Sequence, residues 1–566
     1  MRIWPLALSA YFSLTASASA PEIVKHLHVR IPMNDGVQLA ANIFLPSESG
    51  HFPILLVRTP YNKGEDLIPN YRFFVENGYG VVVEDVRGRY ESEGRFNSFT
   101  QEPKDGDDTI NWVAHQPWSD GKVGMLGGSY VGIAQWKAAL LRNPHLKAIA
   151  PVVSGSDDYR DRFYSTGGAF QLGHRLLWMA ENLRAPDFAM PEFDRFVRTL
   201  PLRQADLAST GRRCETFQKA LDHPADDAFW QNVSTREHLG QISVPVFSVG
   251  GWYDNYVESD LAAFQELRKN SGVHRIVIGP WPHNMSIKFA NADFGRESGA
   301  PIRRMQLQWF DQWLRSKDTP LMSRPPVEIF VMGINRWREE HEWPLARTRV
   351  TPLYFRSHGS ANTLNGDGAL GPRPPRRVSS DRFEFDPRSP VPTAGGAVCC
   401  NPKIFPWGPM DQRRVEQRSD VLVFTSPPLT RNLEVTGQTQ VVLYASTSAP
   451  DTDFTAKLVD VFPNGEARNL SDGILRLRYR NSLSKAELAQ PGEIYKLTID
   501  AGVTSNVFLK GHRVRVEISS SNFPRFDRNP NTGRPIADET TLRKAFQTIY
   551  HDRAHPSRVL LPVIPN

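Results

Sequence analysis

Cysteine is scarce in this chain of 566 residues, with only Cys214, Cys399 and Cys400 present. So few cysteines exclude a disulfide-rich scaffold and a cysteine-based metal site. The sequence leaves three arrangements open: a bridge from Cys214 to one of the adjacent pair, a strained bridge between Cys399 and Cys400, or no bridge. Any single bridge leaves one thiol over, and no residue pattern implies a cofactor.

Charge of one sign is not concentrated in any part of the chain. There are 67 basic and 61 acidic residues, which give a formal net charge of +6, and the two signs are interleaved. The densest basic run, residues 373–377, is short and interrupted by proline. Because nucleic-acid binding normally requires a clustered basic patch or a recognisable module, we expect no nucleic-acid partner.

Apolar runs long enough to span a bilayer, about 18 to 20 residues, are also missing. A shorter apolar stretch, residues 3–14, follows a basic start and precedes the small residues 15–20. This order predicts a secretory signal peptide. We expect cleavage after Ala18, because cleavage after Ala20 would place Pro21 directly after the scissile bond. The mature protein should then be secreted or periplasmic, with no membrane partner.

Between residues 54 and 281 short β-branched runs alternate with helical segments, which indicates a mostly parallel sheet with crossover helices. Near-continuous apolar runs such as residues 81–83 suit strands that are buried on both faces. The predicted strands cover residues 54–58, 81–86, 123–126, 148–153, 244–249 and 275–278. The core is therefore predicted to be α/β.

Two regions depart from this alternation. Between residues 153 and 244 the alternation lapses, and residues at three-to-four spacing, such as Phe170, His174, Leu177 and Trp178, predict an inserted group of helices. After about residue 345, connections rich in proline and glycine separate short strands, which predicts an antiparallel sandwich or jelly roll. These strands are expected at residues 421–425, 439–444, 454–462, 494–499 and 514–518.

The strongest local pattern is a strand, a tight glycine turn, Ser129 and a helix-like segment, residues 123–139. This arrangement predicts a nucleophile elbow, in which small neighbours permit a strained turn and the helix N-terminus stabilises developing negative charge. One position departs from the usual pattern, because Val131 comes two residues after the serine and the glycine is delayed to Gly132.

A serine of ordinary pKa requires a base, and the base requires an orienting carboxylate. Asp254 and His283 each follow a predicted strand, in the order serine, acid, histidine. Each residue has an ordinary structural alternative, a helix N-cap for Asp254 and a plain loop position for His283. Three such residues in this order, each at a strand end, favour a catalytic triad.

The segments 127–132, 251–254 and 279–283 resemble the CocE/NonD group of serine hydrolases, which includes cocaine esterases, α-amino acid ester hydrolases and X-Pro dipeptidyl-peptidases. Segments 58–63, 85–94 and 424–429 extend the resemblance over nearly the whole mature chain. It implies that Ser129 is the nucleophile, His283 the base and Asp254 the orienting acid. It also implies oxyanion donors at the Tyr61 phenol and the Tyr130 backbone N–H. The family tolerates a bulky residue between the Ser-Tyr pair and the glycine, so Val131 fits the resemblance.

The resemblance implies an α/β-hydrolase core with an inserted helical cap and a C-terminal all-β jelly roll. The expected divisions are a signal peptide at 1–18 (1–20 with the later cleavage), hydrolase parts at 19–154 and 241–345, a cap at 155–240 and a jelly roll at 346–566. The expected substrate is a small carboxylic ester or, as the alternative, an amide cleaved by an acylase or X-Pro dipeptidyl-peptidase activity. The sequence leaves open whether the chain forms a homo-oligomer.

Related α-amino acid ester hydrolases carry two carboxylates shortly after the catalytic aspartate, and this chain has uncharged residues at 255–257. Glu258 is expected to be a solvated helix residue. A pocket with aromatic walls is therefore predicted instead, formed by Trp252, Tyr253, Tyr256, Trp281 and Phe170.

A reading from another class is a non-enzymatic binding protein that uses the jelly roll. The chemically competent triad positions weigh against it. Three acidic residues of the β region, Asp451, Asp453 and Asp460, match no calcium loop, and we expect them on a solvated strand face.

Overall fold

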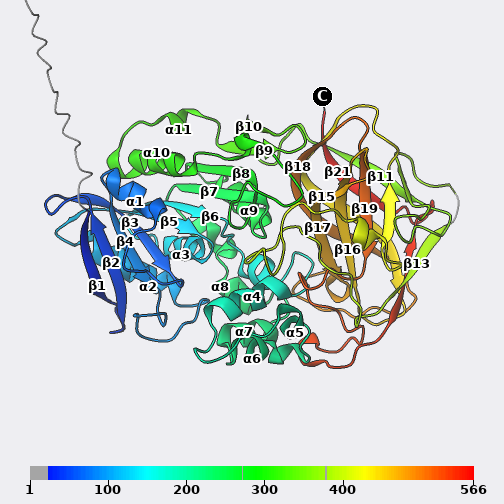
Figure 1. Ribbon diagram of the computed structural model, residues 1–566, viewed down its shortest axis with the longest axis horizontal. Coiled ribbons are helices and arrows are strands. Elements are labelled where there is room, and N and C mark those ends of the chain that lie inside the picture. The colour runs from blue at the N-terminus through cyan, green and yellow to red at the C-terminus, as the bar shows by residue number, and fades with distance from the viewer. Residues whose placement is uncertain (1–22, 271, 377–378, 566) are drawn as a thin grey trace, which may run out of the picture.

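The computed structural model describes residues 23–270, 272–376 and 379–565. Two large sheets lie side by side along the longest axis, and a group of short helices lies below the line where they meet (Figure 1). The predicted signal peptide falls outside the described residues. Within them, no helix combines the length and the apolar character needed to cross a bilayer.

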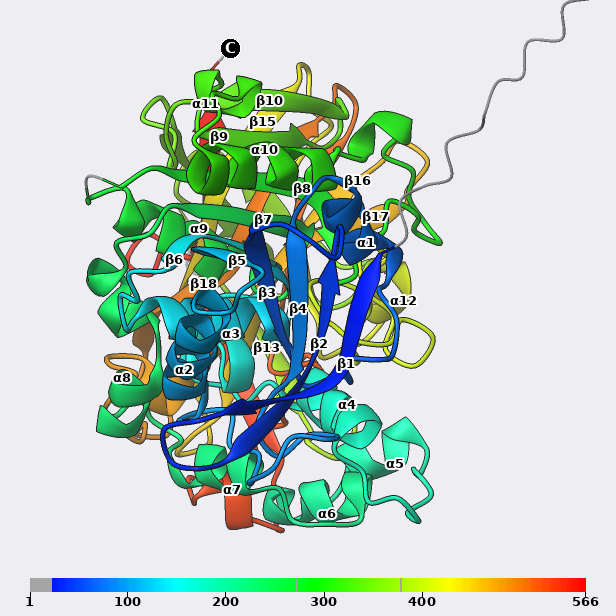
Figure 2. The ribbon, with the colours of Figure 1, turned by 90° about the vertical axis from the view of Figure 1, so that its left-hand side faces the viewer.

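The first sheet has ten strands in the order β1-β2-β4-β3-β5-β6-β7-β8-β9-β10. The strands from β4 to β9 pair in parallel, while β1, β2 and β10 pair antiparallel at the two edges. Figure 2 shows β1 and β2 in front, at one edge. The strands are β1 (Val24–Pro32), β2 (Gln38–Leu45), β3 (Phe52–Thr59), β4 (Gly80–Asp85), β5 (Ser119–Gly128), β6 (Leu146–Val152), β7 (Val246–Tyr253), β8 (His274–Pro282), β9 (Val327–Val331) and β10 (Arg336–Glu340).

Helices cover both faces of this sheet because the central strands are apolar on both sides. On β3, Ile54 and Leu56 pack in one core with helices α2, α3 and α9, while Leu55 and Val57 pack in a second core with α1 and α10. Alternation with a period of two residues sends neighbouring side chains to opposite faces. The helices are α1 (Pro69–Glu76), α2 (Glu102–Ala114), α3 (Tyr130–Ala139), α9 (Val257–Leu267), α10 (Ile302–Arg315) and α11 (Pro320–Ser323).

A helical segment connects β6 to β7 and has its own apolar core. Aromatic residues such as Phe163, Phe170 and Trp230 fill that core, which also takes in Phe523 from the C-terminal part of the chain. The elements are η1 (Asp158–Phe163), α4 (Leu172–Asn182), α5 (Phe193–Val197), η2 (Leu202–Gln204), α6 (Ala205–Thr210), α7 (Glu215–Asp222), α8 (Ala228–Val233) and η3 (Arg236–Gln241).

The second sheet contains eleven strands, and its ladders are antiparallel except for the short pairing of β12 with β14. Its apolar core is continuous with β7, β8, β9 and α9 of the first sheet. The strands are β11 (Arg349–Arg356), β12 (Ala369–Gly371), β13 (Ser380–Phe385), β14 (Leu422–Thr425), β15 (Leu433–Thr447), β16 (Asp453–Val461), β17 (Ala467–Arg476), β18 (Tyr495–Phe508), β19 (Arg513–Ser519), β20 (Ala545–Tyr550) and β21 (Arg558–Ile564). The minor elements around them are η4 (Arg296–Ser298), α12 (Arg413–Glu416), η5 (Leu477–Tyr479) and η6 (Ile536–Asp538).

The acidic residues of β16 and the preceding turn are buried, so the prediction of a solvated strand face for them is wrong. Asp453 pairs with Arg476 at 2.8 Å, and Asp451 pairs with Arg478, also at 2.8 Å. Asp460 accepts a hydrogen bond from the His512 ring at 2.8 Å. Buried carboxylates require such partners, because removing an unpaired charge from water costs several kcal/mol or more.

The cysteines follow one of the arrangements that the sequence left open. Cys399 and Cys400 are joined by a disulfide between neighbouring residues, and Cys214 is a free, buried thiol in the helical segment. Burial raises the pKa of the Cys214 thiol, which makes the thiolate, its reactive form, scarcer.

A buried carboxyl in the second sheet predicts a pH-dependent stability. Burial, together with the nearby Glu416, raises the pKa of Glu517 to about 8, although Lys457 lies 3.6 Å away. Between the pKa of the unfolded chain, about 4.3, and about 8, the native state holds a proton that the unfolded state has lost. The free energy of unfolding should therefore fall with rising pH in this window, by up to about 1.4 kcal/mol per pH unit for this group.

The variant Glu517→Gln keeps the shape of the side chain but cannot ionise. We expect its thermal unfolding midpoint to change less between pH 5 and pH 8 than that of the wild type, and to exceed the wild-type midpoint at pH 8. The exposed residue Glu76 supplies the control, Glu76→Gln, which should follow the wild-type pH profile. Parallel pH profiles for Glu517→Gln and the wild type would contradict the prediction.

Candidate active site

Ser129 occupies the turn between β5 and α3 and has a left-handed backbone, with φ of 57°. Such a conformation is strained for a non-glycine residue and persists only where its surroundings enforce it. Here the Ser129 N–H donates to the Val152 carbonyl at 2.9 Å. A Cβ on Gly127 would lie 2.4 Å from a methyl group of Val131, so glycine at 127 is what allows Val131 to follow the serine.

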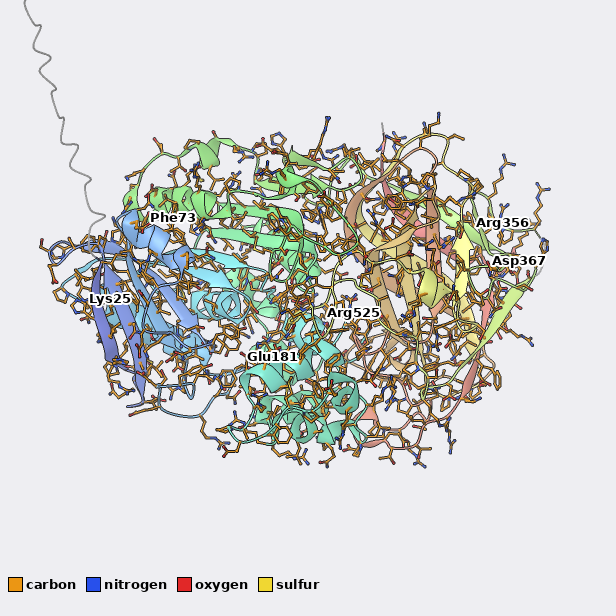
Figure 3. The ribbon with its side chains drawn as sticks, in the orientation of Figure 1. Lys25, Phe73, Glu181, Arg356, Asp367 and Arg525 are labelled. Atoms are coloured by element: carbon orange, nitrogen blue, oxygen red, sulfur yellow. A yellow bond between two sulfur atoms is a disulfide. The ribbon has the colours of Figure 1, made fainter. Side chains whose placement is uncertain are left out.

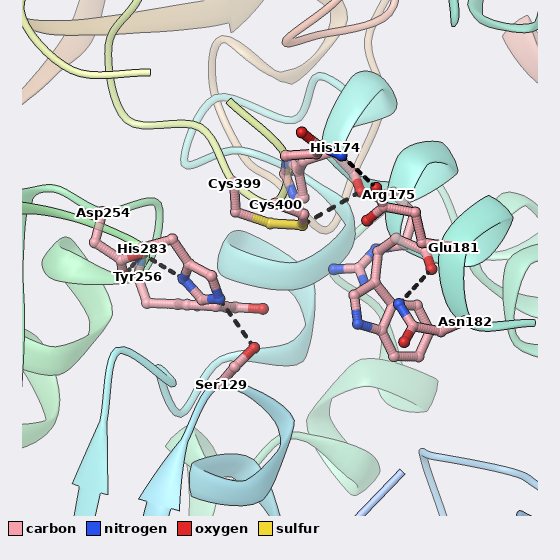
Figure 4. The surroundings of a disulfide bond; sticks show 12 residues. Ser129, His174, Arg175, Glu181, Asn182, Asp254, Tyr256, His283, Cys399 and Cys400 are labelled. Atoms are coloured by element: carbon pink, nitrogen blue, oxygen red, sulfur yellow. Dashed lines mark hydrogen bonds and ion pairs between the residues drawn. A yellow bond between two sulfur atoms is a disulfide. The ribbon is translucent and has the colours of Figure 1, made fainter. Parts of the chain in front are cut away.

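The structure brings the three residues of the predicted triad into direct contact (Figure 4). His283 Nε2 lies 2.9 Å from Ser129 Oγ, and His283 Nδ1 lies 2.6 Å from Asp254 Oδ2. Asp254 is fully buried after β7, and its second oxygen accepts a hydrogen bond from the Tyr256 N–H at 3.0 Å. His283 follows β8, and its side chain is 12% exposed. Solvent therefore reaches the His283 ring, while the Asp254 carboxylate behind it is shielded from water.

The two tyrosines that the sequence assigned to an oxyanion site both lie next to Ser129. The Tyr61 hydroxyl is 3.3 Å from Ser129 Oγ. Tyr130 is the first residue of α3, where a backbone N–H has no partner within its own helix. The Tyr61 phenol therefore lies beside the serine oxygen, and the Tyr130 N–H is the backbone donor that directly follows Ser129 in the chain.

Trp178 of α4 also belongs to this site, although its place in the sequence indicates no role beyond helix packing. Its indole Nε1 donates to the Tyr61 hydroxyl at 3.2 Å, and its ring stacks on the Tyr130 ring at a centroid distance of 6.3 Å. The apolar helical spacing of residues 170–178 located the helix but could not show which residue meets Tyr61.

The hydrogen bonds of these residues run in one direction. An indole N–H can only donate, so the Tyr61 oxygen accepts from Trp178 and is free to donate its own proton to Ser129 Oγ. Ser129 in turn donates to His283 Nε2, because His283 Nδ1–H donates to the Asp254 carboxylate. Each group is therefore oriented by the one behind it.

A buried charge network supports the start of α3 from below. The Tyr130 hydroxyl donates to Glu102 Oε1 at 2.7 Å, and Glu102 pairs with Arg58 at 2.6 Å. Arg58 also pairs with Glu84 at 2.7 Å, and all three ionic side chains are fully buried. The Tyr130 side chain thereby ties the first turn of α3 to this buried network.

Four of the five aromatic residues predicted to line a substrate pocket lie in the core instead. The Trp252 and Trp281 indoles donate to the carbonyls of Phe330 and Ser298, and the Tyr253 hydroxyl donates to that of Asn469. Phe170 packs inside the helical segment. Only Tyr256 meets the site, with its ring 5.7 Å from the His283 ring. The prediction that Trp252, Tyr253, Trp281 and Phe170 form pocket walls is thereby corrected.

Comparison with known proteins agrees with this geometry. The family model of the X-Pro dipeptidyl-peptidase (S15 family) matches residues 35–285, and that of the X-Pro dipeptidyl-peptidase C-terminal non-catalytic domain matches residues 321–560. Cocaine esterase of Rhodococcus sp. (strain MB1 Bresler) is 40% identical over 569 residues, which cover 95% of this chain and 98% of that protein. The chain belongs to the CocE/NonD family of serine hydrolases.

Solved structures of similar proteins match nearly the whole length of this CocE/NonD hydrolase. An aminopeptidase from the marine sediment archaeon Thaumarchaeota archaeon is 27% identical, with a TM-score of 0.85 and coverage of 99% of both chains. An α-amino acid ester hydrolase is 28% identical, with a TM-score of 0.84 and coverage of 98% of both chains. The core is thus an α/β hydrolase followed by an all-β C-terminal part, and the chain is a serine hydrolase that acts on ester bonds.

The charges around the site of this CocE/NonD hydrolase differ from the sequence expectation in one respect. Glu258 is not solvated: it is partly buried, and burial together with Asp500 raises its pKa to about 8. On the side of α4, the Arg175 guanidinium is buried, donates to the Arg162 carbonyl at 3.0 Å and stacks over the Phe163 ring. Among the described residues, no group of three or more His, Cys, Asp or Glu is arranged to hold a metal ion.

Proposed function

We propose that this chain hydrolyses carboxylic esters through an acyl-enzyme formed on Ser129. The observation that carries the proposal is the contact of 2.9 Å between Ser129 Oγ and His283 Nε2, with Asp254 2.6 Å behind the ring. His283 would take the serine proton as Ser129 attacks the ester carbonyl, and would then donate it to the leaving alcohol. Asp254 would hold the tautomer in which Nε2 is free to accept.

The tetrahedral intermediate places a negative oxygen beside the attacking serine. We propose that the Tyr61 phenol and the Tyr130 N–H donate to this oxygen. In the free enzyme the Tyr61 hydroxyl already lies 3.3 Å from Ser129 Oγ, and Trp178 occupies its acceptor side. Donors that are oriented before the reaction stabilise the intermediate without reorganising at the moment of attack.

The charges favour a substrate whose acyl group is uncharged. Residues 255–257 are not acidic, and the buried cation Arg175 lies close enough to Tyr256 to lower the pKa of its phenol, against the larger effect of burial. A substrate ammonium would therefore meet a positive charge from α4. This weighs against amino-acid esters and against peptides with a free amino terminus, the substrates implied by the names of several relatives.

The helical segment at 155–240 is proposed to act as a cap, because Trp178 reaches from it to Tyr61. The division into hydrolase parts at 19–154 and 241–345 and a jelly roll at 346–566 remains a proposal. We also propose that the chain is exported. The N-terminal sequence supports export, as does the Cys399–Cys400 disulfide, since disulfides persist mainly in oxidising compartments.

A substrate panel tests this function. p-Nitrophenyl acetate, butyrate and benzoate represent neutral esters, a phenylglycine ester represents amino-acid esters, and an X-Pro-p-nitroanilide represents dipeptidyl-peptidase substrates. We expect the highest kcat/KM with a neutral ester and at least about tenfold less with the cationic ester, a difference of ~1.4 kcal/mol. Highest turnover of the X-Pro-p-nitroanilide would replace the proposal by the peptidase alternative, and no turnover of any substrate would favour the binding-protein reading.

A further inference from the structure

The Cys399–Cys400 disulfide lies in a loop of the C-terminal part of the chain, between β13 and α12, and this loop packs against helix α4. We define the disulfide loop as residues 397–407. Cys400 Sγ lies 3.9 Å from the His174 carbonyl of α4, and Cys399 is 4% exposed. Figure 4 shows the sulfur pair between the ring of His283 on one side and residues of α4 on the other.

The disulfide loop contacts α4 at further points along the same face of the helix. Asn401 Nδ2 donates to Glu181 Oε1 at 2.9 Å, and Leu177 packs with Val398, Phe405 and Trp407 of the loop in one buried cluster. Together with position 174, these contacts fall at i, i+3 and i+7, which is one stripe of an α-helix. Figure 3 places Glu181 on the helical segment near its junction with the C-terminal strands.

The same side of α4 also meets the active site, through a residue one turn after position 174. Trp178 donates to the Tyr61 hydroxyl and stacks on the Tyr130 ring. Helix α4 therefore contacts both the disulfide loop and the two proposed oxyanion donors. A displacement of the helix by a fraction of an ångström would change the contact of 3.2 Å between the indole and the phenol before it changed any contact within the triad.

We propose that the Cys399–Cys400 disulfide is a positioning group for ester hydrolysis, acting through α4 and Trp178 on the Tyr61 phenol. The bond closes a small ring that restricts the backbone of both residues. After reduction, two thiols occupy more space than one bonded pair, and because Cys399 is buried, Cys400 must move against α4. Ester turnover should therefore depend on the redox state of this pair. The inference rests on the proposed ester hydrolysis.

The test uses the full chain with p-nitrophenyl butyrate before and after treatment with a phosphine. The phosphine supplies two electrons and becomes the phosphine oxide, water supplies its oxygen and two protons, and the S–S bond becomes two thiols. Mass spectrometry after alkylation counts the thiols. We expect kcat to fall about 10- to 100-fold, as for a small misplacement of a catalytic group, with a smaller change in KM and recovery on reoxidation.

Two variants separate positioning from general support of the fold. In Trp178→Phe the indole donor is already missing, so reduction should lower kcat by less than about twofold, because two changes on one path are not additive. Cys214→Ser removes the only other thiol and should respond to the phosphine as the wild type does. Cys399→Ser/Cys400→Ser should resemble the reduced wild type; if it does not fold, the reduced wild type carries the test.

Each possible result of this test either supports or overturns the positioning role of the disulfide. An unchanged kcat after alkylation has shown two new thiols would overturn the positioning role, and so would an equal loss of kcat in Trp178→Phe and the wild type. An oxidised wild type that turns over no ester contradicts the proposed function itself, which is a different failure. A fall in the thermal midpoint with kcat preserved at 25 °C would assign the disulfide to stability alone and overturn the inference.

Discussion

Replacing Ser129 with alanine is expected to lower kcat/KM for p-nitrophenyl butyrate by a factor of roughly 10⁴ to 10⁶. The alanine has no oxygen to attack the ester carbonyl, and the His283 ring loses the group whose proton it would take. Any turnover that persists would come from binding and from the oxyanion donors, which act without the nucleophile. Steady-state kinetics at saturating and at low substrate concentration measure the two parameters separately.

The control for this variant is Ser484→Ala, a serine on the exposed surface of the C-terminal part, which should keep wild-type kinetics. Ser129→Ala should also unfold at a temperature close to that of the wild type, since the change removes one oxygen atom, opens no sizeable cavity and leaves the left-handed backbone at 129 as it is. A folded Ser129→Ala variant that hydrolyses the ester at more than a tenth of the wild-type rate would show that Ser129 is not the nucleophile.

Tyr61→Phe is expected to lower kcat by a factor of about 10² to 10³ and to change KM by much less. The phenol oxygen is 3.3 Å from Ser129 Oγ, and its proton would reach the carbonyl oxygen only as that oxygen becomes negative. An interaction made mainly in the transition state lowers kcat and kcat/KM together when it is lost. The remaining Tyr130 N–H accounts for the activity that is left.

Tyr130→Phe provides the matched comparison. It removes a phenol of the same kind from the neighbouring position but keeps the backbone N–H, so its loss of kcat should be far smaller than that of Tyr61→Phe. Its main effect should be on stability, by about 1 to 3 kcal/mol, because Glu102 Oε1 loses a buried donor. Equal losses of kcat in the two variants would mean that Tyr61 acts through packing and not as a donor.

The central strands of the first sheet could be predicted because they are apolar on both faces. The valine run in β4, for example, is typical of a strand that is covered on both faces. The edge strand β1 mixes polar and apolar residues and lies largely exposed, so its sequence does not distinguish a strand from a loop. Its pairing with β2 is decided by tertiary contacts that no local pattern encodes.

The triad positions could be predicted because their order along the chain and their places after strands are both features of sequence. Trp178 could not, because helical spacing gives the face of a helix and not the residue opposite. The prediction that Trp252, Tyr253, Trp281 and Phe170 form pocket walls was wrong for a related reason. An aromatic side chain is equally suited to a core and to a pocket wall, and only the carbonyl that each buried N–H or O–H finds separates the two roles.

The burial of the acidic residues in the second sheet could not be predicted from the sequence. Their partners lie on the neighbouring strand and in its loops, and the sequence of one strand does not show them. Asp453 is followed 23 residues later by Arg476, on the paired strand β17, and the two form a buried ion pair. The disulfide shows the opposite case: Cys399 and Cys400 are adjacent in sequence, yet adjacency alone did not decide whether they pair.

The continuous apolar core that joins β7, β8, β9 and α9 to the second sheet bears on how this enzyme can be engineered. A chain cut near residue 345 would present that core to water, and Tyr253, next to the triad aspartate, would lose its bond to Asn469. The C-terminal sheet is therefore not an exchangeable module, and truncation should yield an aggregating product instead of a minimal esterase. Directed evolution of the substrate range would therefore have to keep both sheets together in one chain.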